Sequence, residues 1–242
     1  MNFNINASDL PGWLQCPAKQ TFLTTEAYLI ERREFPSVAA VFGSRVDDAV
    51  TYPDSPTQVI PPNTAYDRTT ASKTDLERQV GTLADKLREH IKGWGGEIVM
   101  AQERVETTVG FGYMNITISG RVDLLLKKDD AYRLVDLKTG ENLDKSKIGR
   151  NWPQLVCYLT GLQENHNICA DTATILFGRR GILTMFDKQV SVDQIDMETD
   201  KLIPMFGSYM RRLGSALREP TPVPGAHCRG CPNQGCPFHP GL

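Results

Sequence analysis

The stretch GRVDLLLKKDDAYRLVDLKTG, residues 120–140, decides the fold. Two apolar runs, rich in Leu and Val, flank the polar segment KKDDA at residues 127–131. This pattern is typical of two antiparallel strands joined by a tight turn. Antiparallel pairing can bring Asp123 of the first strand close to Asp136 of the second.

The same hairpin predicts a cation site. Alternate residues of a strand face the same side, so Asp136 and Lys138 are expected to project together while Leu137 points into the core. Two close carboxylates repel each other unless a cation lies between them, and hard oxygen ligands favour Mg²⁺ or Mn²⁺. Lys138 could then orient or activate an attacking water and stabilise charge on a phosphate. An isolated Asp-x-Lys pair, by contrast, is usually a hairpin with surface charges.

Composition sets outer limits on the function. The chain has 242 residues, 40% of them hydrophobic and 23% charged, which is ordinary for a soluble globular domain. The net charge of −2 gives no global basic field for nucleic acid, although a local basic groove remains open. The N-terminus does not resemble a signal peptide, and no apolar run approaches a membrane span, so a cytoplasmic protein is expected.

The pattern along the chain predicts one α/β domain with helices on a central mixed sheet. Ser72 or Thr74 can cap a long amphipathic helix, and an antiparallel meander follows it. The predicted elements are a loop over residues 51–63, a helix over 74–91, strands over 97–110, 112–120, 121–128 and 131–140, a helix over 149–163, strands over 172–181 and 183–191, and a helix over 192–217.

Three motifs resemble one family when they are taken together. GRVD at 120–123, DLKTG at 136–140 and QLVCYL at 154–159, in this order, resemble the RecB-like branch of the PD-(D/E)XK nucleases. The resemblance implies a restriction-endonuclease-like core and one nuclease domain over residues 1–242. Within it, residues 1–95 would be mainly helical, residues 96–190 the catalytic sheet core, and residues 191–242 a helix and a cysteine cluster.

The resemblance also implies roles for individual residues in cleaving DNA phosphodiester bonds. Asp123 and Asp136 would ligate the metal together with the Leu137 carbonyl, and Lys138 would serve the attacking water. Gln154 and Tyr158 lie four residues apart, on one helix face, and would position the substrate or the lysine.

One motif departs from the family pattern. The family often has Gly-x-x-x-His on an early helix, with the histidine as a metal ligand, whereas this chain has GSRVD at 43–47. Asp47 would replace the histidine, and Glu103 is a further candidate ligand. A solvated surface charge is the alternative for both residues. His90 lies on an apolar helix stripe and is expected to pack there.

The tail AHCRGCPNQGCPF, residues 226–238, places three cysteines within nine positions. Cysteine metal sites usually have four ligands, so one ligand is missing. The resemblance to iron–sulfur CRISPR-associated RecB-like exonucleases and AddB-type nuclease domains implies a four-iron cluster that clasps the two terminal regions. Its ligands would be Cys16, Cys228, Cys231 and Cys236. Two alternatives remain open, zinc with His227 or His239 as possible ligands and no metal at all, and Cys157 and Cys169 are expected to be bystanders.

Basic and aromatic residues near the motifs are candidates for DNA binding. Trp152 could stack on an unpaired base or pack in the core, and the cations could equally be a solvated surface. The candidate cations are Lys145, Lys147, Arg150, Arg179, Arg180, Arg211 and Arg212.

The sequence therefore predicts a Mg²⁺- or Mn²⁺-dependent DNA exonuclease acting on single-stranded ends. The expected process is DNA end processing, recombination or repair, or CRISPR adaptation, with a helicase or integrase partner or a homo-oligomer. The alternative is a non-catalytic DNA-binding or scaffold subunit with a degenerate nuclease site.

Overall fold

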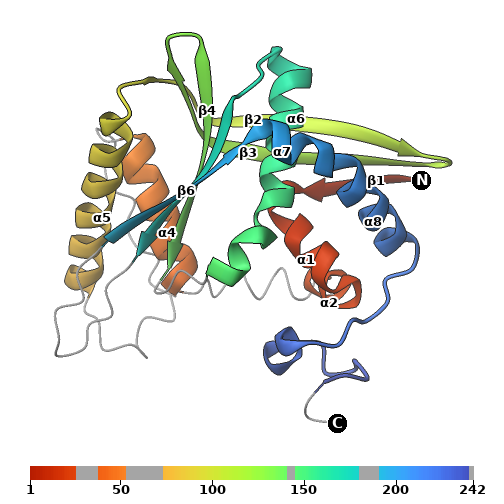
Figure 1. Cartoon of the computed structure of the whole chain (residues 1–242). Helices are drawn as coiled ribbons and strands as arrows, with labels where there is room; N and C mark the ends of the chain where they lie inside the picture. Colours follow the sequence, from red (N-terminus) through yellow and green to blue (C-terminus); the bar gives the residue numbers. More distant parts are fainter. Residues whose placement is uncertain (26–37, 53–72, 141–144, 180–190, 240–242) are drawn as a thin grey trace.

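A mixed β-sheet with helices on both faces forms the centre of the molecule (Figure 1). The computed structural model describes residues 1–25, 38–52, 73–140, 145–179 and 191–239. The described sheet has six strands, with the path β1-β3-β4-β5-β6 and with β2 paired to β3. The predicted α/β class with a mixed central sheet is thereby confirmed.

The described elements follow the chain in a simple order. The strands are β1 (Asn2–Asn6), β2 (Glu97–Phe111), β3 (Met114–Lys128), β4 (Ala131–Gly140), β5 (Thr172–Arg179) and β6 (Ser191–Glu198). The α-helices are α1 (Leu10–Gln15), α2 (Pro17–Leu23), α4 (Val38–Thr51), α5 (Lys73–Gly93), α6 (Trp152–His166), α7 (Thr199–Leu202) and α8 (Phe206–Arg218). Short 3₁₀ turns are η1 (Ala7–Asp9), η3 (Lys145–Arg150), η4 (Ile203–Met205) and η5 (Ala226–Gly230).

Strand β3 organises the sheet because its two edges are used differently. Strand β2 pairs with β3 antiparallel along nearly its whole length. Strands β1 and β4 must therefore share the other edge, where β1 pairs in parallel with residues 115–119 and β4 pairs antiparallel with residues 124–128. Residues 120–123, the GRVD motif, occupy the gap between these two partners.

Two apolar layers fix the sheet between the helices. Helices α4 and α5 cover one face through buried side chains such as Phe42, Leu83 and Leu87. Helices α6, α1 and α8 cover the other face, with buried side chains such as Leu155 and Leu213 (Figure 1). None of the described helices has both the length and the apolar character that a bilayer crossing requires.

The meander differs from its prediction in one respect. The strands predicted over residues 112–120 and 121–128 are a single strand, β3. Gly120 suggested a break, but β2 pairs continuously across this position. The absence of a side chain at Gly120 makes room for Tyr158, because a Cβ atom there would lie 2.5 Å from the Tyr158 Cε1 atom.

The C-terminal prediction was wrong over residues 192–198. These residues belong to β6, which pairs antiparallel with β5 from Arg179–Ser191 to Thr172–Glu198. The helical stretch begins only at Thr199, and it is interrupted by η4 before α8. Pairing with β5 overrides the helical periodicity, and Pro204, which lacks an N–H donor, sits in the interruption.

Several helices and strands also differ from the prediction in where they begin and end. Helix α6 begins at Trp152 instead of residue 149 and extends to His166, where Asn167 takes a left-handed conformation with φ of 56°. Strand β1 was not predicted in the mainly helical N-terminal part. Residues 53–63 of the predicted loop, Ser72 and most of the strand predicted over 183–191 lie outside the described residues.

Two glycines in helix interiors should respond in opposite ways to alanine. A Cβ atom at Gly161 of α6 would lie 2.9 Å from the Val105 Cβ atom, whereas at Gly81 of α5 it would meet no atom within 4 Å. We expect Gly161→Ala to lower the free energy of unfolding by roughly 1–3 kcal/mol through overpacking. Gly81→Ala should raise it by roughly 0.5–1 kcal/mol through helix propensity. Urea denaturation measures both, and equal effects would contradict the packing of α6 on β2.

Candidate active site

Asp123 and Asp136 lie where strands β3 and β4 part. The last pairs of the ladder include Leu125 with Leu134 and then Leu124 with Val135, so the next position in this register places Asp123 opposite Asp136. The Asp123 Oδ2 atom accepts a hydrogen bond of 2.7 Å from the Leu137 backbone N–H. This bond bridges the fork and holds the Asp123 carboxylate beside β4.

Lys138 is tied to the same pair. Its Nζ atom lies 2.8 Å from the Asp136 Oδ1 atom, in an ion pair between a side chain that is 30% exposed and one that is only 1% exposed. Although burial opposes the charged form, Asp136 and then Asp123 raise the pKa of Lys138 above its ordinary value. Lys138 is therefore a cation held by the two carboxylates.

Helix α4 brings a third carboxylate to the fork. Helix α4 packs against β4, and the charges of Lys138 and Asp136 both act on the pKa of Asp47. Gly43, one turn earlier, allows the close approach of α4 to β4, because a Cβ atom there would lie 3.0 Å from the Thr139 Oγ1 atom. The Gly-x-x-x-Asp segment thus presents Asp47 to the DLKTG strand.

Burial and the neighbouring carboxylates raise the pKa values of Asp47 and Asp123 more than Lys138 lowers them. Burial, followed by the Asp136 charge, raises the pKa of Asp123 from 3.8 to about 8. Burial also raises the pKa of Asp47 to about 7, even though Lys138 acts to lower it. Both residues are poised to lose a proton near neutrality when positive charge arrives.

Two carboxylate oxygens have no hydrogen-bond partner in the described part of the chain. They are the buried Asp47 Oδ1 and Asp136 Oδ2 atoms. A buried polar atom without a partner is destabilising, and oxygens of this kind fit a hard divalent cation. Across the described ranges, no group of three or more His, Cys, Asp or Glu side chains is already arranged as a metal centre. The fit therefore rests on the donor chemistry and the unpaired oxygens.

Helix α6 closes the other side of the fork with two polar side chains. The buried Gln154 Nε2 atom donates a hydrogen bond of 2.7 Å to the Tyr158 hydroxyl oxygen. Burial raises the pKa of Tyr158 to about 12, with smaller effects from Gln154 and from the charges of Asp136 and Asp123. Tyr158 therefore remains protonated beside the carboxylates and can donate a hydrogen bond.

The comparison with protein families agrees with this geometry. Residues 4–238 match the family described as the PD-(D/E)XK nuclease superfamily. The chain belongs to this superfamily.

Two solved structures are similar to this chain at low sequence identity. The structure titled SSO0001 is 13% identical, with a TM-score of 0.47, and the match covers 97% of this chain and 85% of that one. An alkaline exonuclease (LHK-Exo) from Laribacter hongkongensis is 12% identical, with a TM-score of 0.35, and the match covers 89% of this chain and 90% of that one. No curated protein sequence matches the nuclease.

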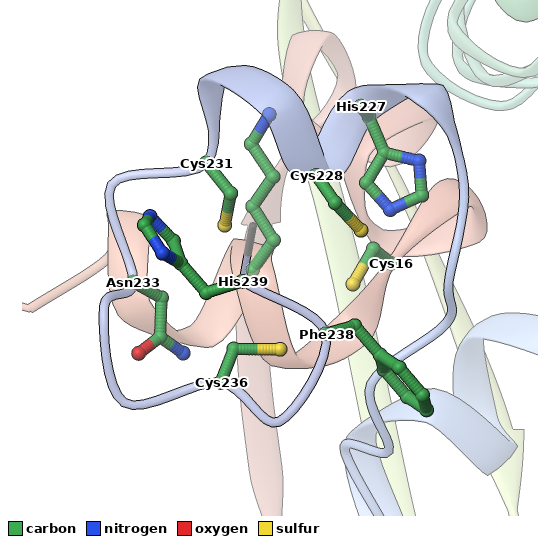
Figure 2. Close-up of a pocket in the computed structure, with 9 residues that line it drawn as sticks. Cys16, His227, Cys228, Cys231, Asn233, Cys236, Phe238 and His239 are labelled. Carbon is green, nitrogen blue, oxygen red and sulfur yellow. The ribbon is translucent and has the colours of Figure 1, made fainter. Parts of the chain in front are cut away.

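The four cysteines of the predicted cluster line one cavity of this PD-(D/E)XK protein. Figure 2 shows their sulfur atoms directed toward a shared space. Cys16 lies at the junction of α1 and α2, whereas Cys228, Cys231 and Cys236 come from the C-terminal tail. The cavity thus joins segments that are more than two hundred positions apart in the chain.

Other side chains of this cavity bear on what it could hold. His227 and His239 line it, so the zinc alternative keeps its candidate ligands. Lys19, which the sequence did not single out, also lines it, and a cation there would offset thiolate charge. Cys157 and Cys169 do not line the cavity. Cys157 is buried in the core, and Cys169 donates a hydrogen bond to Gln163.

In the described part of the structure, no hydrogen bond or ion pair links Glu103 or His90 to the carboxylates of the fork. Glu103 is exposed on β2 and is not among the charges that shift the pKa of Asp123. The His90 Nε2 atom lies 2.5 Å from the Gln194 Oε1 atom, and the His90 ring packs edge-on against Trp94. His90 thus has the packing position that was expected.

The predicted DNA-binding residues have mixed positions. Trp152 is 8% exposed within the core, which fits packing and leaves little of the ring for stacking on a base. Arg150, Arg211 and Arg212 are exposed, and Arg212 donates to the Leu14 carbonyl at 3.0 Å. Arg180 and the side chains of Lys145, Lys147 and Arg179 lie outside the described part of the structure.

The raised pKa values predict how pH affects the metal-free protein. Asp47 and Asp123 have folded-state pKa values of about 7 and about 8, against 3.8 in an unfolded chain. Their contribution to stability is therefore full below about pH 4 and is lost as the pH rises through these folded values. In EDTA, we expect the melting temperature to fall between about pH 4 and about pH 8 and to level off above that.

Mg²⁺ or Mn²⁺ should raise the melting temperature more at the higher pH, because a cation binds the deprotonated carboxylates. Differential scanning fluorimetry measures both effects. Asp130→Asn, at an exposed turn position, should leave the pH dependence unchanged, whereas Asp47→Asn should reduce it. If the metal raises the melting temperature equally at the lower and at the higher pH, the shared carboxylate site is contradicted.

Proposed function

We propose that this chain is a Mg²⁺- or Mn²⁺-dependent DNA exonuclease that hydrolyses phosphodiester bonds at single-stranded ends. The observation that carries the proposal is the fork itself. Asp123 faces Asp136, Lys138 is paired with Asp136, and Asp47 enters from α4 with an unpaired oxygen. In a PD-(D/E)XK nuclease, this is the composition of a working hydrolytic site, and it argues against a degenerate scaffold subunit.

The proposed metal ligands are Asp47, Asp123, Asp136 and the Leu137 carbonyl. A bound divalent cation would supply Lewis-acid stabilisation of the phosphate and would promote ionisation of the attacking water. The hydrogen bond from the Leu137 N–H to Asp123 keeps that carboxylate turned toward β4. The carbonyl of the same residue lies on the backbone between Asp136 and Lys138.

Lys138 acts as a fixed positive charge in this proposal. Because its pKa is raised, its ammonium group remains protonated and orients the attacking water by hydrogen bonding. It also stabilises the negative charge that grows on the phosphate oxygens during in-line attack. The ion pair with Asp136 restricts the ammonium to the fork, so the charge is in place before the substrate binds.

Gln154 and Tyr158 would position the substrate. The Gln154 amide donates to the Tyr158 oxygen, which leaves the Tyr158 O–H free to donate toward a phosphate oxygen. Helix α6 packs against β2 and β3, so these groups have a rigid support.

The preference for single-stranded ends and the biological process rest on the resemblance to the RecB-like branch. On this basis we assign the protein to DNA end processing in recombination, repair or CRISPR adaptation. A helicase or an integrase is the proposed partner class.

We further propose that Cys16, Cys228, Cys231 and Cys236 hold a four-iron cluster. The four sulfur atoms face one cavity (Figure 2), and Lys19 belongs to the lining of that cavity. Linking residue 16 to residue 228 would remove on the order of 5 kcal/mol of chain entropy from the unfolded state. The cluster would stabilise the fold without touching the phosphate.

Asp136→Ala should abolish cleavage while the fold persists. The substitution removes a proposed metal ligand and the anion that holds Lys138. Loss of a residue that acts only with its partners should lower kcat by at least about a thousandfold. The assay follows end-labelled single-stranded DNA with Mg²⁺ or Mn²⁺, and circular single-stranded DNA tests the requirement for an end.

Asp130→Ala is the matched control, because Asp130 is an exposed carboxylate in the β3–β4 turn. It should cleave as the parent does. Full activity of Asp136→Ala, or full activity in excess EDTA, would contradict the proposed mechanism. Rapid cleavage of the circular substrate would contradict the exonuclease assignment alone.

Cys228→Ser should remove the brown colour of a four-iron cluster and lower the melting temperature. Because the cysteine cavity includes none of the residues proposed for catalysis, activity should fall only as the folded fraction falls. Cys169→Ser is the control, since Cys169 is exposed and does not line the cavity. Visible absorption, iron analysis and zinc analysis distinguish the two metals. A colourless parent that unfolds at the same temperature as Cys228→Ser would refute the clasp.

A further inference from the structure

A groove of about 530 Å³ opens beside the fork, on the side of strands β2 and β3. Its lining is polar and includes two arginines that none of the motifs assigns to DNA binding, Arg104 and Arg121. Asn6, Ser8, Gln102, Ser119, Gly120 and Tyr158 complete the lining. Tyr158 thus belongs both to this groove and to the candidate active site.

The two arginines are direct cross-strand partners. Arg104 of β2 pairs with Arg121 of β3 in the antiparallel ladder. Directly opposed residues project from the same face of a sheet, and like charges in this arrangement destabilise the pair. Arg104 is 74% exposed and pairs with Glu106 at 3.9 Å, a surface ion pair that contributes little. In the described residues, no ion pair or hydrogen bond satisfies the Arg121 side chain.

Backbone geometry connects this arginine pair to the catalytic carboxylates. Arg121 precedes Asp123 by two positions in the same strand, a rise of about 7 Å. Gln102 has a φ of 55°, a left-handed conformation that is uncommon outside glycine. The flanking pairs, Ala101 with Leu124 and Glu103 with Val122, place Gln102 opposite Asp123. The groove therefore lies next to the fork, and the irregularity at Gln102 of β2 lies beside Asp123.

We propose that Arg104 and Arg121 form a phosphate subsite for the unpaired DNA strand next to the scissile phosphate. A phosphate between the two guanidinium groups would neutralise their repulsion and accept hydrogen bonds from both. Asn6, Ser8 and Ser119 offer neutral hydrogen-bonding groups along the same path. Tyr158, which belongs to both the groove and the candidate active site, would contact the DNA strand between this subsite and the carboxylates. This inference rests on the proposed nuclease function and extends the same site.

The test compares two double variants that each remove two positive charges. Arg104→Gln/Arg121→Gln removes the groove pair. Lys92→Gln/Lys128→Gln removes two exposed lysines, one at the end of α5 and one at the end of β3, that do not line the groove. Binding of a fluorescein-labelled single-stranded oligonucleotide, and of the same sequence as a duplex, is measured by anisotropy in EDTA across a range of salt concentrations.

The groove variant should bind the single strand at least about tenfold more weakly at low salt than the parent. The slope of log affinity against log salt should flatten by about 0.7 for each phosphate that the variant no longer neutralises. The lysine control should behave as the parent does. In the cleavage assay, the groove variant should raise KM more than it lowers kcat. Its melting temperature should not fall, because a pair of like charges is removed, whereas a structural role would lower it.

The outcomes separate this inference from the proposed function. If the parent cleaves DNA and both double variants bind and cleave DNA as the parent does, the subsite is wrong and the nuclease assignment stands. If the parent binds single strands through the arginines without cleaving them, the subsite stands and the nuclease assignment fails. A loss of affinity confined to the duplex, or a parent that binds no single strand, would overturn the subsite.

Discussion

The structure depends on the opposition of Asp123 and Asp136 at the point where β3 and β4 part. Beyond this point β3 pairs with β1, and β4 continues beside β5, so the two carboxylates stand in the gap between pairs. Their repulsion is offset in part by Lys138 and by one backbone N–H, while burial, followed by the Asp136 charge, raises the pKa of Asp123. The fold holds the two strands at this spacing through packing on both faces of the sheet. The fold therefore bears a local cost in stability, which a bound divalent cation at the proposed site would relieve.

Close approach of the helices completes the fork, and two glycines permit it. Without a side chain at Gly43, helix α4 can bring Asp47 against β4. Without a side chain at Gly120, the Tyr158 ring of α6 can lie over β3. The glycines of GSRVD and GRVD therefore allow close packing, while the aspartates that follow them, Asp47 and Asp123, lie at the fork. Cys16 and the C-terminal cysteines meet elsewhere, at a cavity that none of the fork residues lines.

Local chemistry made part of this structure predictable from the sequence. The KKDDA turn fixes a hairpin register, and that register alone places Asp123 opposite Asp136. The predictions that failed concern strands whose pairing partners are far away in the sequence. Strand β6 has a helical periodicity that pairing with β5 overrides, and β1 pairs with a strand more than a hundred residues away. The pairing of Arg104 with Arg121 was also not predicted, because it depends on the register of β2 on β3. The cysteine cavity was reached only through family resemblance, since sequence spacing does not bring Cys16 to the tail.

Titration of the protein with Mn²⁺, followed by calorimetry at a pH above the raised pKa of Asp123, tests the central claim most directly. If the opposed carboxylates form a cation site, the metal should bind at a defined stoichiometry, and Asp123→Asn should abolish the heat of binding while the melting temperature in EDTA stays the same or rises. The rise would come from the removal of a repelling charge. Equal Mn²⁺ binding by the parent and Asp123→Asn would show that the fork does not hold the ion, and the account of this structure as a metal-dependent nuclease would fail.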